Sequence, residues 1–485
     1  MDGTTTKYPV VFIHGVFGYG STRPLWNTWC PYWPEQALHT MNPTHVLLQV
    51  GVLSSDHDRA CEAFYQLYGG RVDYGQAHSH DARHKRFGGT HATPLHPTWS
   101  AAHPIHLVGH SFGSTTALEL YQLLCADFFH KGTDHRWVQS LVAIAGPLSG
   151  STLPHLLGLH EPRVEPYSLG HVVGSALCLW FKLQTDVPLL RHVFDFRMPQ
   201  WENITSVREL LSTSGRIHRS RDLAVFDILP KERMQRNAQL RDMDKLYLVS
   251  VITSSHVRMP YLELALGTLV LVFGLASTLC ARPNAMALTT LARGSFLATL
   301  WSLSRRARML DYASMPSFYA LVVLMRRHVR MLHMIFDGFD RDVWSENDGA
   351  VNLHSMLRPW ATTRDRVKAS SALTSTAFPP LETGTATVAS RTVAEKVEKE
   401  TLDPLDVTKP VHAFKLRRGE WYVHRVQKNH MAGTHFDSDA PAFYQRLFQV
   451  MTHHFERDAM SSSHAMSSSP PSCFSRTKSS ENTPS

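Results

Sequence analysis

Short, uninterrupted apolar runs recur along the chain, and stretches with helical spacing of apolar residues lie between them. Such runs are typical of strands buried on both faces of a parallel sheet. They occupy residues 8–14, 45–51, 105–110, 140–146 and 246–253, with a last one at 420–427. Helices are predicted at 58–68 and 112–129, and a closing helix at 440–458. This alternation predicts an α/β domain with a mostly parallel central sheet flanked by helices.

Three regions depart from that rhythm. Residues 260–335 are apolar and helical in character. Residues 365–408 are rich in Ser, Thr and Ala and are predicted to be a flexible insertion, while the Ser-rich tail 459–485 is predicted to be disordered. We therefore expect one domain over residues 1–458, carrying two insertions and followed by the tail.

Composition narrows the class of protein. A hydrophobic fraction of 43% in 485 residues suffices for a sizeable core. The net charge of +8 could favour an anionic surface, but no dense Lys/Arg run with interleaved aromatic residues occurs, so nucleic acid is not an expected partner. The six cysteines form no CxxC pair, which argues against a disulfide framework or a zinc ribbon. The start, "MDGTTTKYPVVFIHG", lacks the basic and apolar regions of a signal peptide, and we expect an intracellular protein.

The segment "IHLVGHSFGSTTALELY" carries the most specific chemical motif. Its Gly109-His110-Ser111-Phe112-Gly113 is G-x-S-x-G between a predicted strand and a predicted helix. At such a turn the serine is held in a strained backbone conformation that projects its hydroxyl, and the two glycines leave room for close packing. The alternative, an ordinary Gly/Ser turn, lacks a reason for this strand-turn-helix context. Ser111 is the predicted nucleophile.

A serine hydroxyl needs a base and an orienting carboxylate, which follow in the order Ser, Asp or Glu, His on such a fold. Asp348, in "VWSENDGAVN", is the candidate acid, and His424, His430 and His435 near the last strand are candidate bases. The residues alone do not choose among these histidines.

An oxyanion needs hydrogen-bond donors, and the first predicted strand ends in "HGVFG". A His-Gly turn there leaves backbone N–H groups free. The N–H groups of Val16 and of Phe112, just after the nucleophile, are the expected donors.

The motifs together resemble those of the thermoalkalophilic and staphylococcal triacylglycerol lipases, which have the α/β-hydrolase fold. The matching segments include "VVFIHGVFGYG", "VGVLSSDHDRACEAFYQLYGGRVDYG", "HLVGHSFGSTTALEL", "SENDGAVNLHSM" and "DAPAFYQRL". The resemblance implies Ser111 as nucleophile, Asp348 as acid and His430 as base. It does not cover residues 260–335 or 365–408.

Four histidines crowd the stretch "VDYGQAHSHDARHKRFGGTH" (72–91). A solvated polar loop is one interpretation, because the chain holds 30 His in all. The resemblance implies another, an inserted subdomain with a structural zinc held by two aspartates and two histidines. Carried onto this chain, the zinc ligands are Asp58, His78, His84 and Asp227, a donor set suited to a closed tetrahedral site.

Many relatives also bind calcium close to the catalytic histidine, through a Glu two residues after it and an Asp-Pro further on. Here Ala432 takes the place of that Glu, and "GTHFDSDAP" replaces the second segment. A hard cation requires several oxygen ligands, which Asp437 or Asp439 alone does not supply. We therefore expect no calcium site of the family type.

Two apolar segments concern access to lipid. Residues 168–196 stand where the family has its lid helix, although a plain core helix would show the same pattern. Residues 264–281 are eighteen uncharged residues, the lower limit for a membrane span, and 286–303 is a poorer run broken by Arg293. A membrane hairpin, an interfacial anchor and an extended lid all remain open for this insertion.

Taken together, the sequence predicts a serine carboxylic-ester hydrolase, a lipase acting on acylglycerols at a membrane or lipid-droplet surface. A lipid acyltransferase with the same triad and a catalytically silent lipid-binding protein are the alternatives. The sequence does not identify any protein partner.

Overall fold

The computed structural model describes residues 4–24, 31–160, 163–202, 220–254, 308–361 and 402–456. The apolar runs 264–281 and 286–303, nearly all of the predicted flexible insertion 365–408 and the predicted tail 459–485 lie outside these ranges. The domain boundaries proposed above are therefore only partly covered by the description that follows.

A six-stranded sheet forms the centre of the molecule, and all its strands pair in parallel, as predicted. The spatial order is β10-β9-β6-β5-β1-β2. The strands are β1 (Val10–Ile13), β2 (Val46–Leu47), β5 (Ile105–His110), β6 (Val138–Ile144), β9 (Tyr247–Thr253) and β10 (Trp421–Val426). Each predicted run contains or overlaps a strand, although only two residues of run 45–51 pair with β1.

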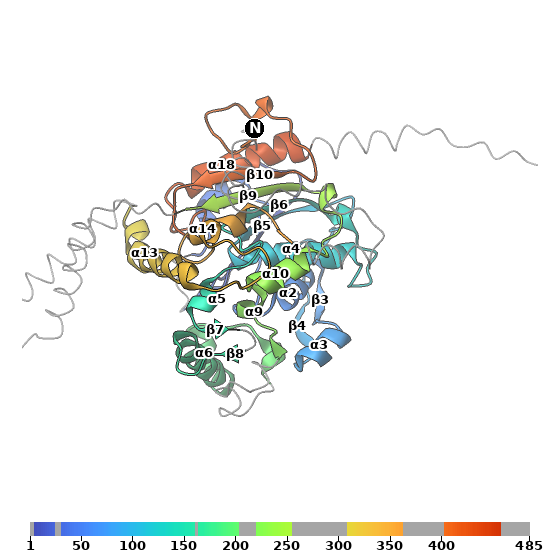
Figure 1. Cartoon of the computed structure of the whole chain (residues 1–485). Helices are drawn as coiled ribbons and strands as arrows, with labels where there is room; N and C mark the ends of the chain where they lie inside the picture. Colours follow the sequence, from blue (N-terminus) through green and yellow to red (C-terminus); the bar gives the residue numbers. More distant parts are fainter. Residues whose placement is uncertain are drawn as a thin grey trace, which may run out of the picture.

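Helices cover both faces of this sheet (Figure 1). On one face α2 (Asp56–Tyr68) and α4 (Phe112–Cys125) pack against strand residues such as Leu107 and Leu141. On the other face α1 (Glu35–Met41) and α18 (Ala440–Val450) pack against the alternate residues, including Val108 and Val142. Because side chains alternate across a strand, the uninterrupted apolar runs supply both of these cores.

Shorter strands and further helices lie outside this arrangement of central sheet and flanking helices. A hairpin of β3 (Gly70–Asp73) and β4 (Phe87–His91) flanks α3 (Gln76–Ala82), and β7 (Leu159–His160) pairs with β8 (Arg163–Val164). The remaining helices of the described ranges are α5 (Leu153–Leu156), α6 (Leu169–Asp186), α9 (Ala224–Asp227), α10 (Pro230–Asn237), α13 (Arg308–Met331), α14 (Arg341–Ser345) and α15 (Leu353–Leu357). Single turns are η2 (His135–Trp137), η3 (Pro188–His192), η4 (Pro199–Trp201), η5 (Met243–Lys245), η7 (Val411–Ala413) and the π-type η8 (Met451–Phe455).

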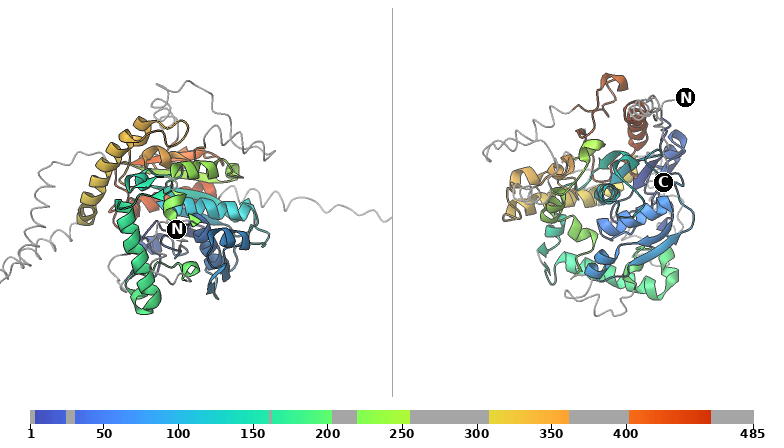
Figure 2. Two further views of the ribbon diagram at one scale, coloured as in Figure 1. Left: turned by 60° about the horizontal axis from the view of Figure 1, so that its bottom comes forward. Right: turned by 90° about the vertical axis from the view of Figure 1, so that its right-hand side faces the viewer.

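The two longest helices of the described part, α6 and α13, stand out from the body of the molecule in Figure 2. Helix α6 lies within the predicted lid segment 168–196, and α13 lies within the predicted apolar region 260–335. Neither of them, nor any other helix of the described ranges, is long and apolar enough to cross a membrane.

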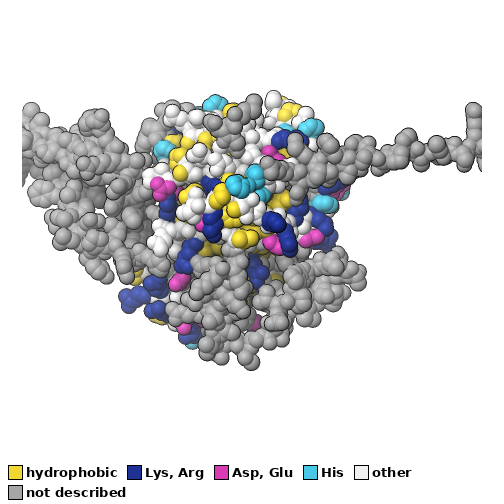
Figure 3. All heavy atoms as spheres, turned by 90° about the horizontal axis from the view of Figure 1, so that it is seen from above, with side chains coloured by type: hydrophobic (Ala, Val, Ile, Leu, Met, Phe, Trp, Pro, Cys, Tyr) yellow, Lys and Arg dark blue, Asp and Glu magenta, His cyan; other side chains and the backbone are white. Residues whose placement is uncertain are grey.

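Charged side chains of both signs are interspersed with hydrophobic ones on the face shown in Figure 3, and histidines are scattered among them. This view agrees with the sequence, in which positive charge is spread rather than gathered into one run.

Candidate functional site

Ser111 stands at the turn from β5 into α4, in the strained conformation that its motif predicts. Its φ of 54° and ψ of −129° are rarely adopted by a residue with a side chain. A Cβ at Gly109 would lie 2.4 Å from the carbonyl oxygen of Gly113, and a Cβ at Gly113 would lie 2.0 Å from that of Ile13. Both glycines are therefore required by the packing of the turn against the sheet.

The side chains of Ser111, His430 and Asp348 meet at this turn, although they are far apart in the sequence. His430 Nε2 lies 2.7 Å from Ser111 Oγ, and His430 Nδ1 lies 2.8 Å from Asp348 Oδ2. His430 follows β10, and Asp348 lies between α14 and α15. This arrangement allows the serine hydroxyl to donate to His430 while Asp348 accepts from the other ring nitrogen.

Asp348 is fully buried and held by several donors. Oδ1 accepts from the backbone N–H groups of Ala350 and Val351, at 3.0 and 2.8 Å, and Oδ2 also accepts from the Thr253 hydroxyl. Burial alone would raise the pKa of this carboxyl, but the charge of His430 and these hydrogen bonds lower the pKa below its usual value. Asp348 is therefore ionised and fixed in place beside His430.

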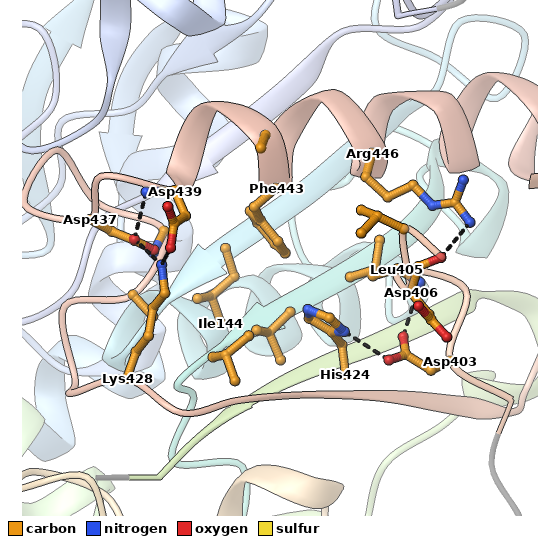
Figure 4. A pocket seen from close by; sticks show the side chains of 16 residues that line it. Ile144, Asp403, Leu405, Asp406, His424, Lys428, Asp437, Asp439, Phe443 and Arg446 are labelled. Carbon is orange, nitrogen blue, oxygen red and sulfur yellow. Dashed lines mark hydrogen bonds and ion pairs between the residues drawn. The ribbon is translucent and has the colours of Figure 1, made fainter. Parts of the chain in front are cut away.

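The other two candidate histidines lie elsewhere. His424 Nδ1 contacts Asp403 Oδ2 at 2.8 Å, at one end of a pocket of about 300 Å³ that is lined by residues of α18, β6, β9 and β10 (Figure 4). His435 donates its backbone N–H to the carbonyl of Tyr32. Of the three histidines, His430 is the one whose ring bonds to Ser111.

The turn after β1 passes directly over Ser111. A Cβ at Gly15 would lie 2.8 Å from the Cβ of Ser111, so only glycine allows this approach. Arg59, buried in α2, donates to the carbonyls of His14 and Gly51 and so fixes the end of β1. Val16 follows in this turn, and Phe112 is the first residue of α4, where helix geometry leaves the N–H without an intrahelical acceptor.

Asp58, His78, His84 and Asp222 form a second cluster, in which one ligand atom of each lies within 4.8 Å of the others. His78 Nε2 is 3.1 Å from Asp58 Oδ1 and 3.3 Å from Asp222 Oδ1. Ser55 caps α2 by accepting from the backbone N–H of Asp58, which sets Asp58 in the first turn. The two histidines come from α3 and from the loop before β4.

The donor set of this cluster fits a zinc ion. Two imidazole nitrogens and two carboxylate oxygens are typical ligands, and four of them suit a closed site. His84 Nε2 and Asp222 Oδ2 are buried and lie 3.2 Å apart, yet neither makes a hydrogen bond within the described residues. Buried polar atoms that make no hydrogen bond are costly, and a shared cation would satisfy both.

The fourth predicted ligand needs a correction, because Asp222 and not Asp227 joins this cluster. Asp227 forms an ion pair with Arg236 at 2.5 Å, and its other oxygen accepts from the backbone N–H of Asp56. The two aspartates are five residues apart in "RDLAVFD", and α9, which begins at Ala224, turns Asp227 away from Asp222. Because this short segment contains two aspartates, the sequence could have indicated Asp222 as an alternative ligand.

Lys428, two residues before His430, pairs with two carboxylates of the segment that follows His430. Lys428 Nζ contacts the carboxylate of Asp437 and lies 2.9 Å from Asp439 Oδ2, while Asp437 also accepts from the Gly433 N–H. One ammonium group thus already pairs with both carboxylates considered for calcium. That no calcium site forms here stays a prediction.

The chain resembles known lipases in sequence. Residues 6–164 match the family model described as "Lipase-like, C-terminal domain". The chain is 33% identical over 255 residues to a lipase of Staphylococcus hyicus, covering 47% of this chain and 37% of that lipase. It is 31% identical over 191 residues to lipase 2 of Staphylococcus aureus strain MRSA252, covering 35% and 28% of the two chains. The chain thus matches about a third of the length of these relatives, and the resemblance to staphylococcal lipases is confirmed.

Solved structures extend the likeness over the fold. EstA from Clostridium botulinum has a TM-score of 0.56 at 20% identity, covering 93% of this chain and 88% of its own. The crystal structure of Staphylococcus hyicus lipase has a TM-score of 0.53 at 17% identity, covering 97% and 99%. Together with the parallel sheet and its flanking helices, these likenesses define an α/β-hydrolase fold, as predicted.

Proposed function

We propose that this protein is a serine carboxylic-ester hydrolase, a lipase acting on acylglycerols, with Ser111, His430 and Asp348 as its catalytic triad. The observation that carries the proposal is the continuous hydrogen-bonded line from Ser111 Oγ through His430 to Asp348 at a strained strand-to-helix turn. The likeness to staphylococcal lipases supports acylglycerols as the substrate class.

In the first half of the reaction, Ser111 Oγ attacks the ester carbonyl carbon while His430 Nε2 takes the hydroxyl proton. The negative charge on the carbonyl oxygen is stabilised by the backbone N–H groups of Val16 and Phe112, and losing one such donor typically costs about 3 kcal/mol. The intermediate collapses to an acyl-serine when His430 gives its proton to the leaving alcohol. Water, activated by His430, then releases the carboxylic acid by the same route.

Zinc is proposed as a structural ion held by Asp58, His78, His84 and Asp222. Bound to these residues it would join α2, α3 and the segment before α9, and so stabilise the native state. No reacting group depends on it, because the cluster shares no residue with the proposed triad. The hairpin β3–β4 with α3 is accordingly proposed as the zinc subdomain.

Helix α6 is proposed as the lid. Of its residues only Phe181 and Gln184 are buried, whereas Leu169 and Val172 are 62% and 60% exposed. A plain core helix would bury more of its apolar residues, and an exposed apolar face suits contact with a lipid surface. The segment after α6 reaches the turn of the proposed oxyanion site, where the rings of Phe194 and Phe17 lie 6.5 Å apart.

The test is a substrate panel with a covalent label. Wild-type protein and Ser111→Ala are given p-nitrophenyl esters, emulsified triacylglycerols and a fluorophosphonate probe. We expect wild type to release carboxylic acid and take one label, and Ser111→Ala to do neither. Acyl transfer to an added alcohol in place of acid release would identify an acyltransferase, and an unreactive Ser111 would indicate a lipid-binding protein.

A further inference from the structure

Two buried polar side chains bridge the turn after β1 and the segment that carries His430. The Gly15 N–H donates to Tyr32 Oη at 3.1 Å, and Tyr32 Oη lies 2.6 Å from His110 Nδ1. His110 Nε2 lies 2.8 Å from the backbone carbonyl oxygen of His430. Both side chains are buried, and neither has a role in the mechanism above.

The partners fix the direction of every hydrogen bond in this chain. A carbonyl oxygen only accepts, so His110 Nε2 carries a proton and donates to His430. Neutral His110 then has a bare Nδ1, to which the Tyr32 hydroxyl donates. The Tyr32 oxygen is left free to accept from Gly15. Each group is satisfied in a single arrangement, as buried polar networks require.

The surroundings keep His110 neutral. Burial, and after it the charge of the neighbouring His430, lower the pKa of His110 to about 3, against the opposing hydrogen bond to the His430 carbonyl and the charge of Asp348. A proton on Nδ1 would face the Tyr32 hydroxyl, which then could no longer donate to it. The added charge would also oppose the imidazolium that His430 becomes during catalysis.

We propose that Tyr32 and His110 are positioning residues that hold the proposed oxyanion turn and the proposed general base in register through this one-directional hydrogen-bond chain. The inference rests on the proposed function, because it concerns the same site. Tyr32 holds the backbone next to Val16, and His110 holds the backbone of His430. Breaking the chain loosens both groups that must act together when charge develops on the substrate oxygen.

The first variant is Tyr32→Phe, which removes the hydroxyl and keeps the ring. We expect kcat for a soluble p-nitrophenyl ester to fall about tenfold while KM stays unchanged, since an interaction that matters in the transition state is lost. The acid limb of kcat/KM should move to higher pH, because His110 Nδ1 loses its donor and can take a proton. Tyr121→Phe is the matched control, a buried tyrosine whose hydroxyl donates to the Asp242 carbonyl at 2.6 Å away from the site.

The second pair of variants separates the two ends of His110. In His110→Gln the amide nitrogen can replace Nε2 and still donate to the His430 carbonyl, so we expect kcat within about threefold of wild type. In His110→Asn the side chain ends near Nδ1 and loses that donor, so we expect the tenfold loss. His106→Gln is the matched control, a buried histidine of the same strand that bonds Ser140 and Glu456. In Tyr32→Phe/His110→Gln the losses should not add, and the acid limb should return.

The rate of fluorophosphonate labelling at Ser111 is measured beside kcat in every variant. If wild type takes the label and Tyr32→Phe matches Tyr121→Phe in rate and pH profile, the inference is overturned and the proposed function still stands. A lower melting temperature in Tyr32→Phe with unchanged kcat also overturns it. If wild type takes no label, both proposals are overturned. If wild type is labelled but hydrolyses no ester, the labelling rate of each variant replaces kcat as the test of the hydrogen-bond chain.

Discussion

The proposed triad and the candidate metal cluster are both built from side chains far apart in the sequence, but they differ in how many of their buried polar atoms are hydrogen-bonded. The side chains of Ser111, His430 and Asp348 are hydrogen-bonded to one another. Asp348 also accepts hydrogen bonds from the Thr253 hydroxyl and from two backbone N–H groups. In the cluster of Asp58, His78, His84 and Asp222, two buried polar atoms have no hydrogen-bond partner within the described residues. The side chains of the proposed triad are thus hydrogen-bonded by other groups of the protein, whereas the candidate metal cluster is suited to binding an ion.

The same difference appears in the backbone. Ser111 holds a strained conformation that costs on the order of 1–3 kcal/mol and that the surrounding packing must impose. Asp58 occupies an ordinary first helical turn with a serine cap. Helix α2 joins the two regions, since Asp58 is followed by Arg59, which holds the end of β1. The strain at the proposed nucleophile lies in the backbone, whereas the cost at the cluster lies in buried side-chain atoms that make no hydrogen bond within the described residues.

The largest effect that this comparison predicts is on catalysis. Ser111→Ala, His430→Ala and Asp348→Ala should each lower kcat for p-nitrophenyl esters by about 10⁴-fold or more, and the double variants should lose little beyond that, because the three act as one unit. The melting temperature should change little by comparison. His424→Ala, whose ring bonds Asp403, is the control that should keep near-full kcat. Loss of activity in His424→Ala with His430→Ala unaffected would show that the base is misplaced.

The sequence predicted the local features of this region well, because they depend on neighbouring residues. The strand before Ser111, the turn and the helix after it follow from an apolar run and two glycines within seventeen residues. Choosing His430 over His424 and His435 needed the family resemblance, since all three lie near the end of the last strand. Tyr32 was not found, because its partner His110 is 78 positions away and no local pattern links them.

The metal cluster shows where such prediction stops. Asp58, His78 and His84 were implied by the family resemblance, whose motifs cover the helix and hairpin around them, and all three belong to the observed cluster. The fourth member was placed on Asp227, whereas Asp222 occupies the position. Which of two aspartates five residues apart faces the cluster depends on where α9 begins, and helix boundaries are the least certain part of a sequence-based prediction.

The second prediction therefore concerns those two aspartates. We expect freshly prepared protein to hold about one zinc per chain by metal analysis, and Asp222→Ala or His84→Ala to lose most of it. Both variants should unfold at a lower temperature than wild type and lose about a few kcal/mol of unfolding free energy, because an ion that binds only the native state stabilises it. They should keep most of their kcat, because the cluster shares no residue with the proposed triad. Asp227→Ala is the matched control for metal content, since Asp227 pairs with Arg236. Wild type without zinc before any dialysis would contradict the site.

A smaller effect is expected at Glu62, one turn after Asp58 in the helix that joins the two regions. Burial raises the pKa of Glu62 to about 8, against hydrogen bonds from Gly51 and Tyr74. Between the ordinary pKa and this value the unfolded chain is ionised while the native state keeps its proton, so stability must fall as pH rises. Glu62→Gln should remove this slope and gain on the order of 2 kcal/mol over wild type between pH 5 and 8, measured by urea unfolding.

The control is Glu346→Gln, directly after α14, because the Glu346 side chain is half exposed and its substitution should leave the slope unchanged. Equal slopes for wild type and Glu62→Gln would mean that Glu62 is ionised in the native protein. The helix would then carry a buried charge beside the metal cluster.

The smallest predicted effect concerns the backbone strain at Ser111, the proposed nucleophile. Ser111→Gly and Ser111→Ala both remove the hydroxyl, but only glycine adopts a φ of 54° without steric cost. After allowing for the greater freedom of glycine in the unfolded chain, Ser111→Gly should be more stable than Ser111→Ala by about 1 kcal/mol. The same pair at Ser114, inside α4, should show the opposite order, because glycine costs about 1 kcal/mol relative to alanine in a helix. If alanine is the more stable substitution at both positions, the turn is not strained and the contrast between the two regions fails.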